Sequence, residues 1–334
     1  MYLVTGGAGF IGSHIVERLV GMGEKVRVLD NFTSGGLDNL CGFMDKTELV
    51  LGDLLDQAVV QKAMEGVEVV FHEAALRSVP FSVENPALVN RVNVEGTVNV
   101  LVAARNAGVR RVVYASSSSV YGNTKELPKR EHLAPSPVSP YAVSKLSGEY
   151  YLKVFGELYG LETVSLRYFN VFGPRQDPTS QYASVIPRFI RWAYRGEPLE
   201  VHGDGLQSRD FTYIDNVVSA NLQAAHSRKG IGGVFNVGQG KAYTLLDLVD
   251  LLQEILGRDL HLLHTAERPG DVRHTLADIS EAEICLGYHP QVSFEEGIAR
   301  TAKYFNGQGA AVADPCLIGS NDPTKRRIYH AKQT

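Results

Sequence analysis

A glycine-rich turn near the start of the chain constrains the fold more than any other feature. Residues 7–12 read Gly-Ala-Gly-Phe-Ile-Gly and come directly after an apolar strand at residues 2–5. Apolar side chains then recur every four residues over 11–19, and Gly21 and Gly23 end the predicted helix. Backbone without side chains can approach a ligand closely, and a helix N-terminus offers unpaired N–H groups. The pattern predicts a strand–turn–helix unit that binds a phosphate group.

Short apolar runs alternate with helical patterns through the first half of the chain. The runs cover residues 2–5, 25–30, 48–53, 67–72, 111–116 and 162–168. Strands that are apolar almost throughout are typical of a sheet covered on both faces. Helices predicted at 86–108 and 141–160 supply crossovers between parallel strands. We therefore predict an α/β fold with a Rossmann-type, doubly wound, mainly parallel sheet.

The strand–helix rhythm loosens after Tyr168, where Gly and Pro become frequent. We predict a nucleotide-binding domain over 1–168, with later strand and helix contributions near 210–240. A smaller, mainly substrate-binding lobe is expected over 169–305. Residues 306–334 lack apolar periodicity and are predicted to form a poorly packed tail.

Composition excludes several classes of protein. Hydrophobic residues make up 44% and charged residues 21% of the 334 residues, as in folded globular proteins. The formal net charge of -4 leaves no basic surplus for nucleic acid. The three cysteines form no C-x-x-C pair, so no metal site is expected. No apolar run is long enough to cross a bilayer and no leader pattern follows Met1, so we expect no membrane partner and a cytoplasmic location.

An acidic residue at the end of the second predicted strand indicates which dinucleotide binds. Asp30 lies 18 residues after Gly12. A carboxylate there can accept hydrogen bonds from both hydroxyls of an adenosine ribose, which favours NAD. Arg27 lies nearby, so NADP is an alternative cofactor. A second alternative is that the glycine turn serves tight packing and binds no dinucleotide.

A Tyr-x-x-x-Lys pair begins the helix at 141–160. Tyr141 and Lys145 are four residues apart, which places them on one helical face. Lowering a phenol pKa by about three units needs roughly 4 kcal/mol, which Lys145 and an oxidised nicotinamide, both cations, can provide. Read separately, the two residues would be a core aromatic and a surface charge. The serines at 116–119 and the dinucleotide fold favour acid–base chemistry instead.

With these motifs, residues 1–305 resemble extended short-chain dehydrogenase/reductases of the nucleotide-sugar epimerase and dehydratase group. The resemblance is closest to UDP-N-acetylglucosamine 4-epimerases. It implies that Tyr141 is the acid/base, and that Lys145 modulates its pKa and binds the nicotinamide ribose. Counted back from the Val-Tyr-Gly turn, Ser117 takes the serine position that binds the sugar O4, with Ser118 a close second.

The resemblance also implies a set of residues around NAD. They are Gly6, Gly9, Phe10, Ile11, Gly12, Asp30, Asn31, Asp53, Leu54, Arg77, Asn93, Tyr141, Lys145 and Tyr168. Asp53 and Leu54 are expected near adenine. For members outside the two motifs, a role as a turn cap or surface polar group is the alternative.

The reaction follows from what is missing beside the serines. Dehydratases of this group carry an Asp-Glu pair, and decarboxylases a Ser-Glu pair, where this chain has Ser118 and Ser119. Without that extra carboxylic acid, the resemblance favours 4-epimerisation. It implies transient oxidation at C4 by tightly bound NAD, proton transfer to Tyr141, and hydride return to the other face of the sugar.

The resemblance further implies a UDP-sugar substrate. The implied contacts are Ser117, Asn170, Ser184, Val185, Ile186, Arg209, Arg268 and Thr275. Asn170 and Arg209 are expected at the diphosphate, Arg268 as a second cation, and residues 184–187 beside uridine. A structural ion pair between Arg209 and Asp210 is the alternative for that arginine.

Thr275 carries the choice of sugar. Family members restricted to UDP-glucose and UDP-galactose have a bulky Tyr at this position, whereas Thr leaves space for a 2-N-acetyl group. We therefore expect UDP-N-acetylglucosamine and UDP-N-acetylgalactosamine, with relaxed use of UDP-glucose and UDP-galactose possible. UDP-glucuronate 4-epimerisation and a non-catalytic NAD-binding module are the alternatives. The helices at 86–108 and 141–160 resemble those through which the family forms homodimers.

Overall fold

A seven-stranded sheet forms the centre of the computed structural model, which describes residues 1–178, 184–266 and 272–308. The strands are β1 (Tyr2–Thr5), β2 (Val26–Asp30), β3 (Thr47–Leu51), β4 (Val69–His72), β5 (Arg111–Ser117), β6 (Glu162–Tyr168) and β11 (Val234–Val237). Their order is β11-β6-β5-β4-β1-β2-β3, and every neighbouring pair is parallel. Every residue of β2 and β4 is buried, as expected for strands covered on both faces. The predicted Rossmann-type sheet is confirmed.

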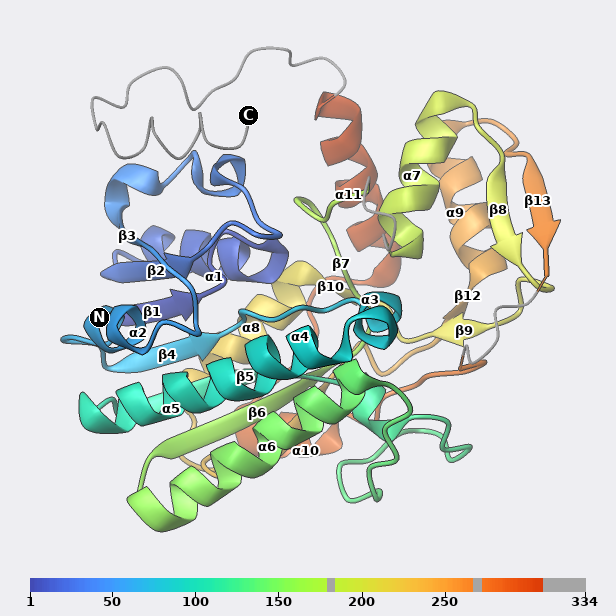
Figure 1. Cartoon of the computed structure of the whole chain (residues 1–334). Coiled ribbons are helices and arrows are strands. Elements are labelled where there is room, and N and C mark those ends of the chain that lie inside the picture. Colours follow the sequence, from blue (N-terminus) through green and yellow to red (C-terminus); the bar gives the residue numbers. More distant parts are fainter. Residues whose placement is uncertain (179–183, 267–271, 309–334) are drawn as a thin grey trace.

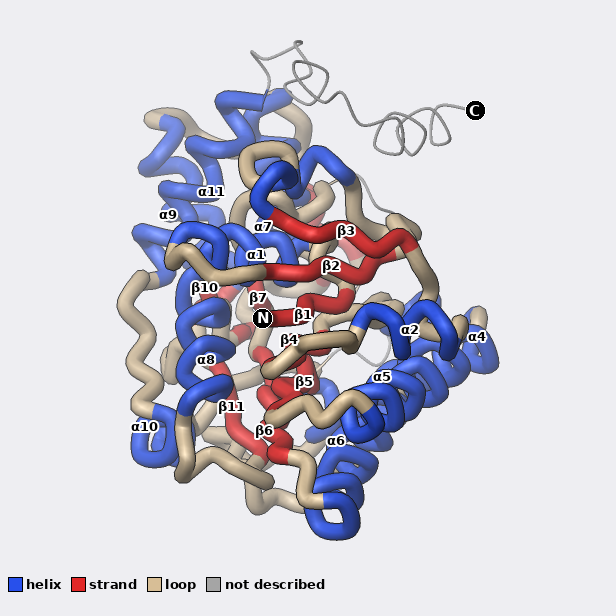
Figure 2. Tube along the Cα trace, turned by 90° about the vertical axis from the view of Figure 1, so that its left-hand side faces the viewer, coloured by secondary structure: helices blue, strands red, loops and turns tan. Residues whose placement is uncertain are grey.

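Helices cover both faces of this sheet (Figure 2). One layer contains α1 (Phe10–Gly21) and α8 (Ile214–His226), which pack on each other. The other contains α2 (Gln57–Ala63), α5 (Gly96–Asn106) and α6 (Pro140–Tyr159). Ser139 caps α6 by accepting a hydrogen bond from the Ala142 N–H, and Gly160, in the left-handed conformation, ends it.

The helix predicted at 86–108 forms as three consecutive segments. These are α4 (Pro86–Asn90), a π-helical turn η3 (Arg91–Glu95) and α5. A short helix, α3 (Val79–Glu84), precedes them, and 3₁₀ turns occur at η1 (Leu37–Leu40), η2 (Met44–Lys46) and η4 (Ser118–Tyr121). The π turn shifts the helical register at Asn93, so that its side chain is directed inward.

A smaller lobe lies beside the carboxyl edge of the sheet, on the right of Figure 1. Its helices are α7 (Val185–Arg195), α9 (Leu245–Leu256) and α11 (Phe294–Gln308). Its strand pairs are β8 (Leu199–His202) with β13 (Leu262–Thr265), β9 (Ser208–Arg209) with β12 (Tyr243–Thr244), and β7 (Val171–Phe172) with β10 (Thr212–Tyr213). Thr244 and Asp247 form a capping box at the start of α9.

The chain passes between the two lobes more than once. α8 and β11 follow residue 168 in sequence but pack in the sheet layers, as does α10 (Ser280–Leu286), which contacts β11. The domain boundary at 168 stays a prediction. Residues 306–308 of the predicted tail belong to α11, and 309–334 lie outside the described residues.

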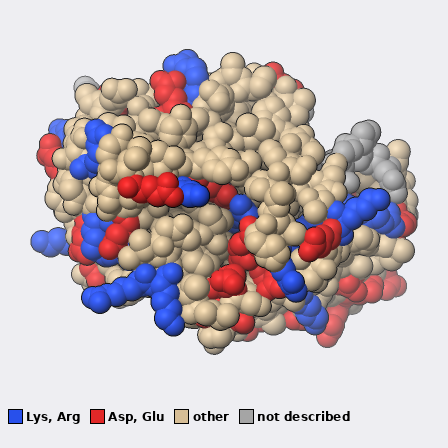
Figure 3. Space-filling view, turned by 90° about the horizontal axis from the view of Figure 1, so that it is seen from below, with Lys and Arg blue, Asp and Glu red and all other residues tan. Residues whose placement is uncertain are grey.

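Seen from below (Figure 3), acidic and basic side chains are intermixed on one face of the molecule. None of the helices in the described part of the chain is both long and apolar enough to span a membrane.

Candidate functional site

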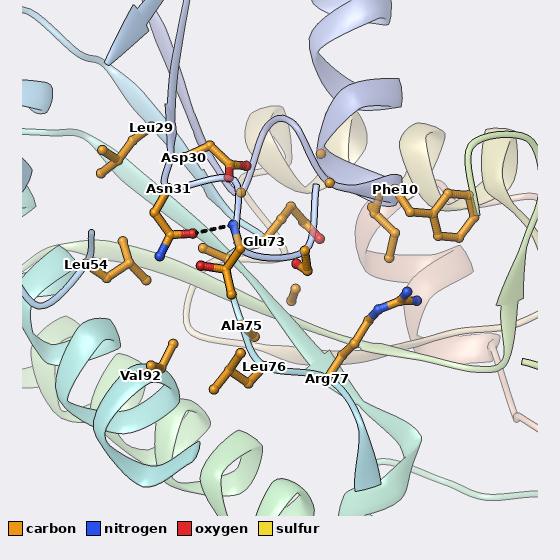
Figure 4. Close-up of a pocket in the computed structure, with 18 of the residues that line it drawn as sticks. Phe10, Leu29, Asp30, Asn31, Leu54, Glu73, Ala75, Leu76, Arg77 and Val92 are labelled. Carbon is orange, nitrogen blue, oxygen red and sulfur yellow. Dashed lines mark hydrogen bonds between the residues drawn. The ribbon is translucent and has the colours of Figure 1, made fainter. Parts of the chain in front are cut away.

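A cavity of about 520 Å³ opens where the carboxyl ends of the parallel strands meet. Every predicted cofactor-binding residue lines it except Asn93. In Figure 4, Asp30, Asn31 and Leu54 lie on one side, Phe10 and Arg77 on the other, with Glu73 between them. The residues come from six separate parts of the chain, and the sheet brings them together.

The glycine turn forms a cradle that a side chain would fill. A Cβ on Gly12 would lie 2.2 Å from the Gly6 carbonyl oxygen, and one on Gly6 would lie 2.8 Å from Ala74 backbone atoms at a φ of +67°. Gly9 begins α1 without a side-chain cap, and the first turn contains no acidic residue. The backbone N–H groups at this helix start therefore suit the pyrophosphate of NAD.

Asp30 is fixed at the end of β2 by backbone donors. Its Oδ2 accepts from the Ala8 N–H at 2.9 Å and its Oδ1 from the Phe32 N–H at 2.7 Å. A carboxylate oxygen can accept more than one hydrogen bond, so a ribose hydroxyl could donate to the same side chain. Arg27, the reason for considering NADP, donates instead to the Ala63 and Glu65 carbonyls and to Glu48. This position therefore favours NAD.

Asn31 and Asp53 form the neighbouring wall. Asn31 Nδ2 donates to Asp53 Oδ2 at 2.8 Å, and Asp53 Oδ1 accepts from the Leu55 N–H at 2.9 Å. The pair orders the loops after β2 and β3 beside Leu54, where adenine was expected.

Asn93 lies behind the cavity rather than in its wall. Its side chain accepts from the Leu76 N–H at 2.8 Å and donates to the Leu76 carbonyl at 3.0 Å. It also donates to Ser144 Oγ at 3.0 Å. Asn93 therefore ties the loop after β4 to α6, one residue before Lys145.

Tyr141 and Lys145 line the cavity, and Ser117 interacts with Tyr141. Tyr141 and Lys145 lie one turn apart on α6, and an interaction with Ser117, at the end of β5, acts to lower the pKa of Tyr141. Ser117 Oγ also accepts from the Ser119 N–H at 3.2 Å and from Ser119 Oγ at 2.9 Å. Ser117, rather than Ser118, is thus the serine brought to the tyrosine.

The electrostatics of this group are set by burial. Burial raises the pKa of Tyr141, against the Ser117 hydrogen bond and the charge of Arg77, which lower it. Burial also lowers the pKa of Lys145 to about 8. Lys145 donates to the Ala115 carbonyl at 2.8 Å and remains mostly protonated at neutral pH. The pKa of Tyr141 is therefore raised rather than lowered in the protein alone, and the positive charge that acts to lower it is that of Arg77 rather than the expected Lys145.

Three further residues that line this cavity were not predicted as site residues. Glu73 follows β4 and accepts from the Tyr168 hydroxyl at 2.9 Å. Arg175 and Asp177 reach into the cavity from the smaller lobe, and Arg175 donates to Glu17 on α1 at 2.6 Å. No local motif marks these positions, because their placement depends on tertiary packing.

A second cavity, of about 250 Å³, lies in the smaller lobe. Asn170, Ser184, Val185, Ile186 and Arg209 all line it. Arg268 lies outside the described residues.

Thr275 contacts one of the residues that line the second cavity, Asn170. Thr275 Oγ1 accepts from Asn170 Nδ2 at 3.3 Å. Arg209 donates to the carbonyls of Ser208 and Arg273, both at 3.0 Å. Asp210 is held by three backbone N–H groups, from Gln239, Gly240 and Ala277, which removes the basis for a structural Arg209–Asp210 pair.

Within the described ranges, no group of three or more His, Cys, Asp or Glu side chains is placed to hold a metal ion.

Comparison with known proteins gives consistent matches. The model of the NAD dependent epimerase/dehydratase family matches residues 2–238. A putative UDP-glucose 4-epimerase of Methanocaldococcus jannaschii is 40% identical over 306 residues, 91% of this chain and 98% of that protein. The UDP-N-acetylglucosamine 4-epimerase of Methanobrevibacter ruminantium, solved with UDP-N-acetylmuramic acid, has a TM-score of 0.88 and 43% identity, covering 92% of this chain and 98% of that one. A mutant UDP-glucuronic acid 4-epimerase of Bacillus cereus, solved with NAD and UDP-4-deoxy-4-fluoro-glucuronic acid, has a TM-score of 0.85 and 33% identity, covering 92% and 99%.

Proposed function

This chain belongs to the NAD dependent epimerase/dehydratase family and is an NAD-dependent UDP-sugar 4-epimerase, and we propose that it interconverts UDP-N-acetylglucosamine and UDP-N-acetylgalactosamine. One observation carries this choice of sugar. Thr275 has a small side chain and accepts a hydrogen bond from Asn170, a wall residue of the second cavity, and a small residue at this position is the feature expected of an enzyme that accepts a 2-N-acetyl group. The 43% identity to a UDP-N-acetylglucosamine 4-epimerase supports the same choice.

The proposed chemistry assigns one role to each catalytic side chain. NAD, when bound, supplies the acceptor and donor of a hydride at the sugar C4. Tyr141 in its ionised form takes the O4 proton and later returns it, and Ser117 hydrogen-bonds O4. Lys145 stabilises the phenolate with its positive charge and binds the nicotinamide ribose. Ser118 remains a second candidate for the serine role.

A panel of UDP-sugars tests the substrate. UDP-N-acetylglucosamine, UDP-glucose and UDP-glucuronate are each incubated with the purified holoenzyme, without added cofactor, and the 4-epimers are separated by chromatography. We expect the highest kcat/KM for UDP-N-acetylglucosamine and weaker turnover of UDP-glucose. A higher kcat/KM for UDP-glucose or UDP-glucuronate contradicts the proposal and transfers the assignment to that sugar.

We also propose that the enzyme is a homodimer. α4 and α6 pack side by side (Figure 1), and both carry exposed apolar side chains. These are Leu88, Val143, Tyr150, Tyr151, Val154 and Leu158. The same face of a second copy would bury them. Light scattering at working concentration should give twice the chain mass, and a particle of 36.5 kDa contradicts dimerisation. The cytoplasmic location stays a prediction.

A further inference from the structure

Glu73 is an acidic side chain in the catalytic cavity to which the proposed chemistry gives no role. It directly follows β4 and lines the cavity together with Tyr141, Lys145 and Tyr168. Figure 4 shows Glu73 near the middle of the cavity, between Asp30 and Arg77. An acid so close to the reacting group affects every charge around it.

The carboxylate of Glu73 is held by a buried hydroxyl. Tyr168 Oη, at the end of β6, lies 2.9 Å from Glu73 Oε1 and 2.8 Å from Asn221 Nδ2 on α8. Asn221 Nδ2 also donates to the Val217 carbonyl at 2.9 Å, which orients the amide. The Tyr168 hydroxyl has one proton and two acceptors within reach, Glu73 Oε1 at 2.9 Å and Asn221 Oδ1 at 3.1 Å, and the shorter of the two contacts is the one to Glu73.

Three titratable groups face Glu73, namely Tyr168 from β6 and Tyr141 and Lys145 from α6. Burial raises the pKa of Glu73 to about 7, while the Tyr168 hydrogen bond and the charge of Lys145 lower it. In return, the negative charge of Glu73 raises the pKa of Lys145 and that of Tyr141. Lys145 donates to the Ala115 carbonyl, so Glu73 acts on it across the cavity rather than through a direct bond.

These opposing charges matter because one tyrosine must work in both directions. In the proposed epimerisation, Tyr141 takes a proton and later returns it to the same oxygen. Arg77 lowers the pKa of Tyr141, and excessive positive charge would stabilise the phenolate and slow the return of the proton. Glu73 offsets that effect in its ionised form, which predominates above its pKa of about 7. Among the groups that raise the pKa of Tyr141, Glu73 is the carboxylate.

We propose that Glu73 is a positioning residue that balances the charge around Tyr141, keeping Lys145 protonated and allowing Tyr141 to return its proton as readily as it takes one. The inference rests on the proposed roles of Tyr141 and Lys145. Glu73 itself transfers no proton to the sugar. It acts through the two α6 side chains, and Tyr168 fixes where its charge lies.

Glu73→Gln isolates the charge from the shape of the side chain. Glutamine has the same length, and its Oε1 can still accept from Tyr168, so the packing is retained while the negative charge is lost. Glu73→Asp is the matched control, because it keeps the charge on a shorter side chain. Tyr141→Phe identifies which part of a tyrosine titration belongs to Tyr141.

The measurement is a titration of the holoenzyme by the ultraviolet difference absorbance of tyrosinate. Subtracting the Tyr141→Phe curve leaves the Tyr141 step. In Glu73→Gln we expect this step at lower pH than in the wild type, and in Glu73→Asp a return toward the wild-type position. The low-pH limb of the kcat profile should move in the same direction. A Tyr141 step at an unchanged or higher pH in Glu73→Gln overturns the proposal.

Failure of the underlying chemistry gives a different result. If Tyr141→Phe epimerises normally, the proposed role of Tyr141 is wrong, whatever Glu73 does. If Tyr141→Phe is inactive and the Tyr141 step does not move in Glu73→Gln, the catalytic assignment stands and the role of Glu73 is refuted. Tyr168→Phe adds an independent check, since losing the hydroxyl should weaken the effect of Glu73 and move the step in the same direction as Glu73→Gln.

Discussion

Replacing Thr275 with tyrosine tests the choice of sugar most directly. The Thr275 N–H donates to the Ser208 carbonyl at 3.0 Å, which fixes the backbone at this position. Its hydroxyl contacts Asn170, whose φ of +30° marks a constrained backbone. Neither neighbour can easily retreat from a larger side chain. The ring of Thr275→Tyr is therefore expected to occupy the space in which the 2-N-acetyl group would lie.

The expected size of the effect follows from packing energetics. Overfilling a fitted site costs about 1 to 3 kcal/mol, which corresponds to roughly a five- to 150-fold loss. The loss should fall on the N-acetylated sugar, because UDP-glucose has only a hydroxyl at C2. We predict that the ratio of kcat/KM for UDP-N-acetylglucosamine to that for UDP-glucose falls at least about tenfold, within this range. Using the ratio cancels any general loss of folded enzyme.

Thr275→Val separates volume from hydrogen bonding. Valine has nearly the same shape as threonine but cannot accept from Asn170, and losing such a bond costs about 0.5 to 1.5 kcal/mol. That cost should affect both sugars alike, so kcat/KM falls while the ratio stays constant. An unchanged ratio in Thr275→Tyr refutes the reasoning, because it means that Thr275 lies away from C2 of the bound sugar. A ratio that falls equally in Thr275→Val assigns the selectivity to Asn170 instead.

Three further predictions concern the tyrosine, the glycine turn and a buried histidine. Tyr141→Phe should abolish epimerisation but retain NAD, since the ring still packs, and normal turnover contradicts the mechanism. Gly12→Ala should lose NAD on gel filtration, because its Cβ meets the Gly6 oxygen, whereas Gly21→Ala, with open space around its Cβ, should keep it; equal retention contradicts the cradle. Burial lowers the pKa of His72 to about 3, so the unfolded chain alone binds that proton below about pH 6.5. His72 should therefore lower the free energy of unfolding by about 2 kcal/mol at about pH 5. In urea unfolding, the free energy of unfolding should fall less between neutral pH and about pH 5 in His72→Asn than in the wild type, and equal decreases contradict this.

The protonation of His72 follows from its two hydroxyl neighbours. Thr97 Oγ1 donates to the Asn93 carbonyl at 2.6 Å, so it can only accept from His72 Nε2, 2.9 Å away. Nδ1 then accepts from Thr5 Oγ1 at 2.7 Å. Both ring nitrogens are satisfied in the neutral form, which explains why acid must unfold this region to protonate the ring.

The central sheet could be predicted because its strands carry their own signal. The apolar residues of these strands mark their positions, and β1 and β6 match the predicted ranges at both ends, although β6 also contains Glu162, Thr163, Ser165 and Arg167. β3 is an edge strand with partly exposed residues, so its apolar run marks its limits poorly; it ends at Leu51 rather than 53. The π turn within 86–108 could not be predicted, because a single inserted register shift leaves the apolar periodicity nearly intact.

Parts of the candidate site could also be predicted from the sequence, and other parts could not. The glycine turn and the Tyr-x-x-x-Lys pair are local patterns, so their spacing alone places them. The choice between Ser117 and Ser118 depends on where β5 ends and η4 begins, since that turn directs each hydroxyl. Sequence spacing cannot set such a direction, and the resemblance left the two serines as alternatives.

The Glu73–Tyr168 contact shows why the rest of the site was beyond sequence reasoning. The two residues are 95 positions apart and end strands β4 and β6, which are separated in the sheet by β5. Strands two places apart lie roughly 10 Å from each other, so the side chains meet only if both lean over the strand between them. Ala115, on β5, is small enough to permit this, and its carbonyl also accepts from Lys145. An acid that follows β4, a phenol at the end of β6 and an ammonium on α6 thus come together beside β5, and this combination exists only after the parallel strands have aligned their carboxyl ends.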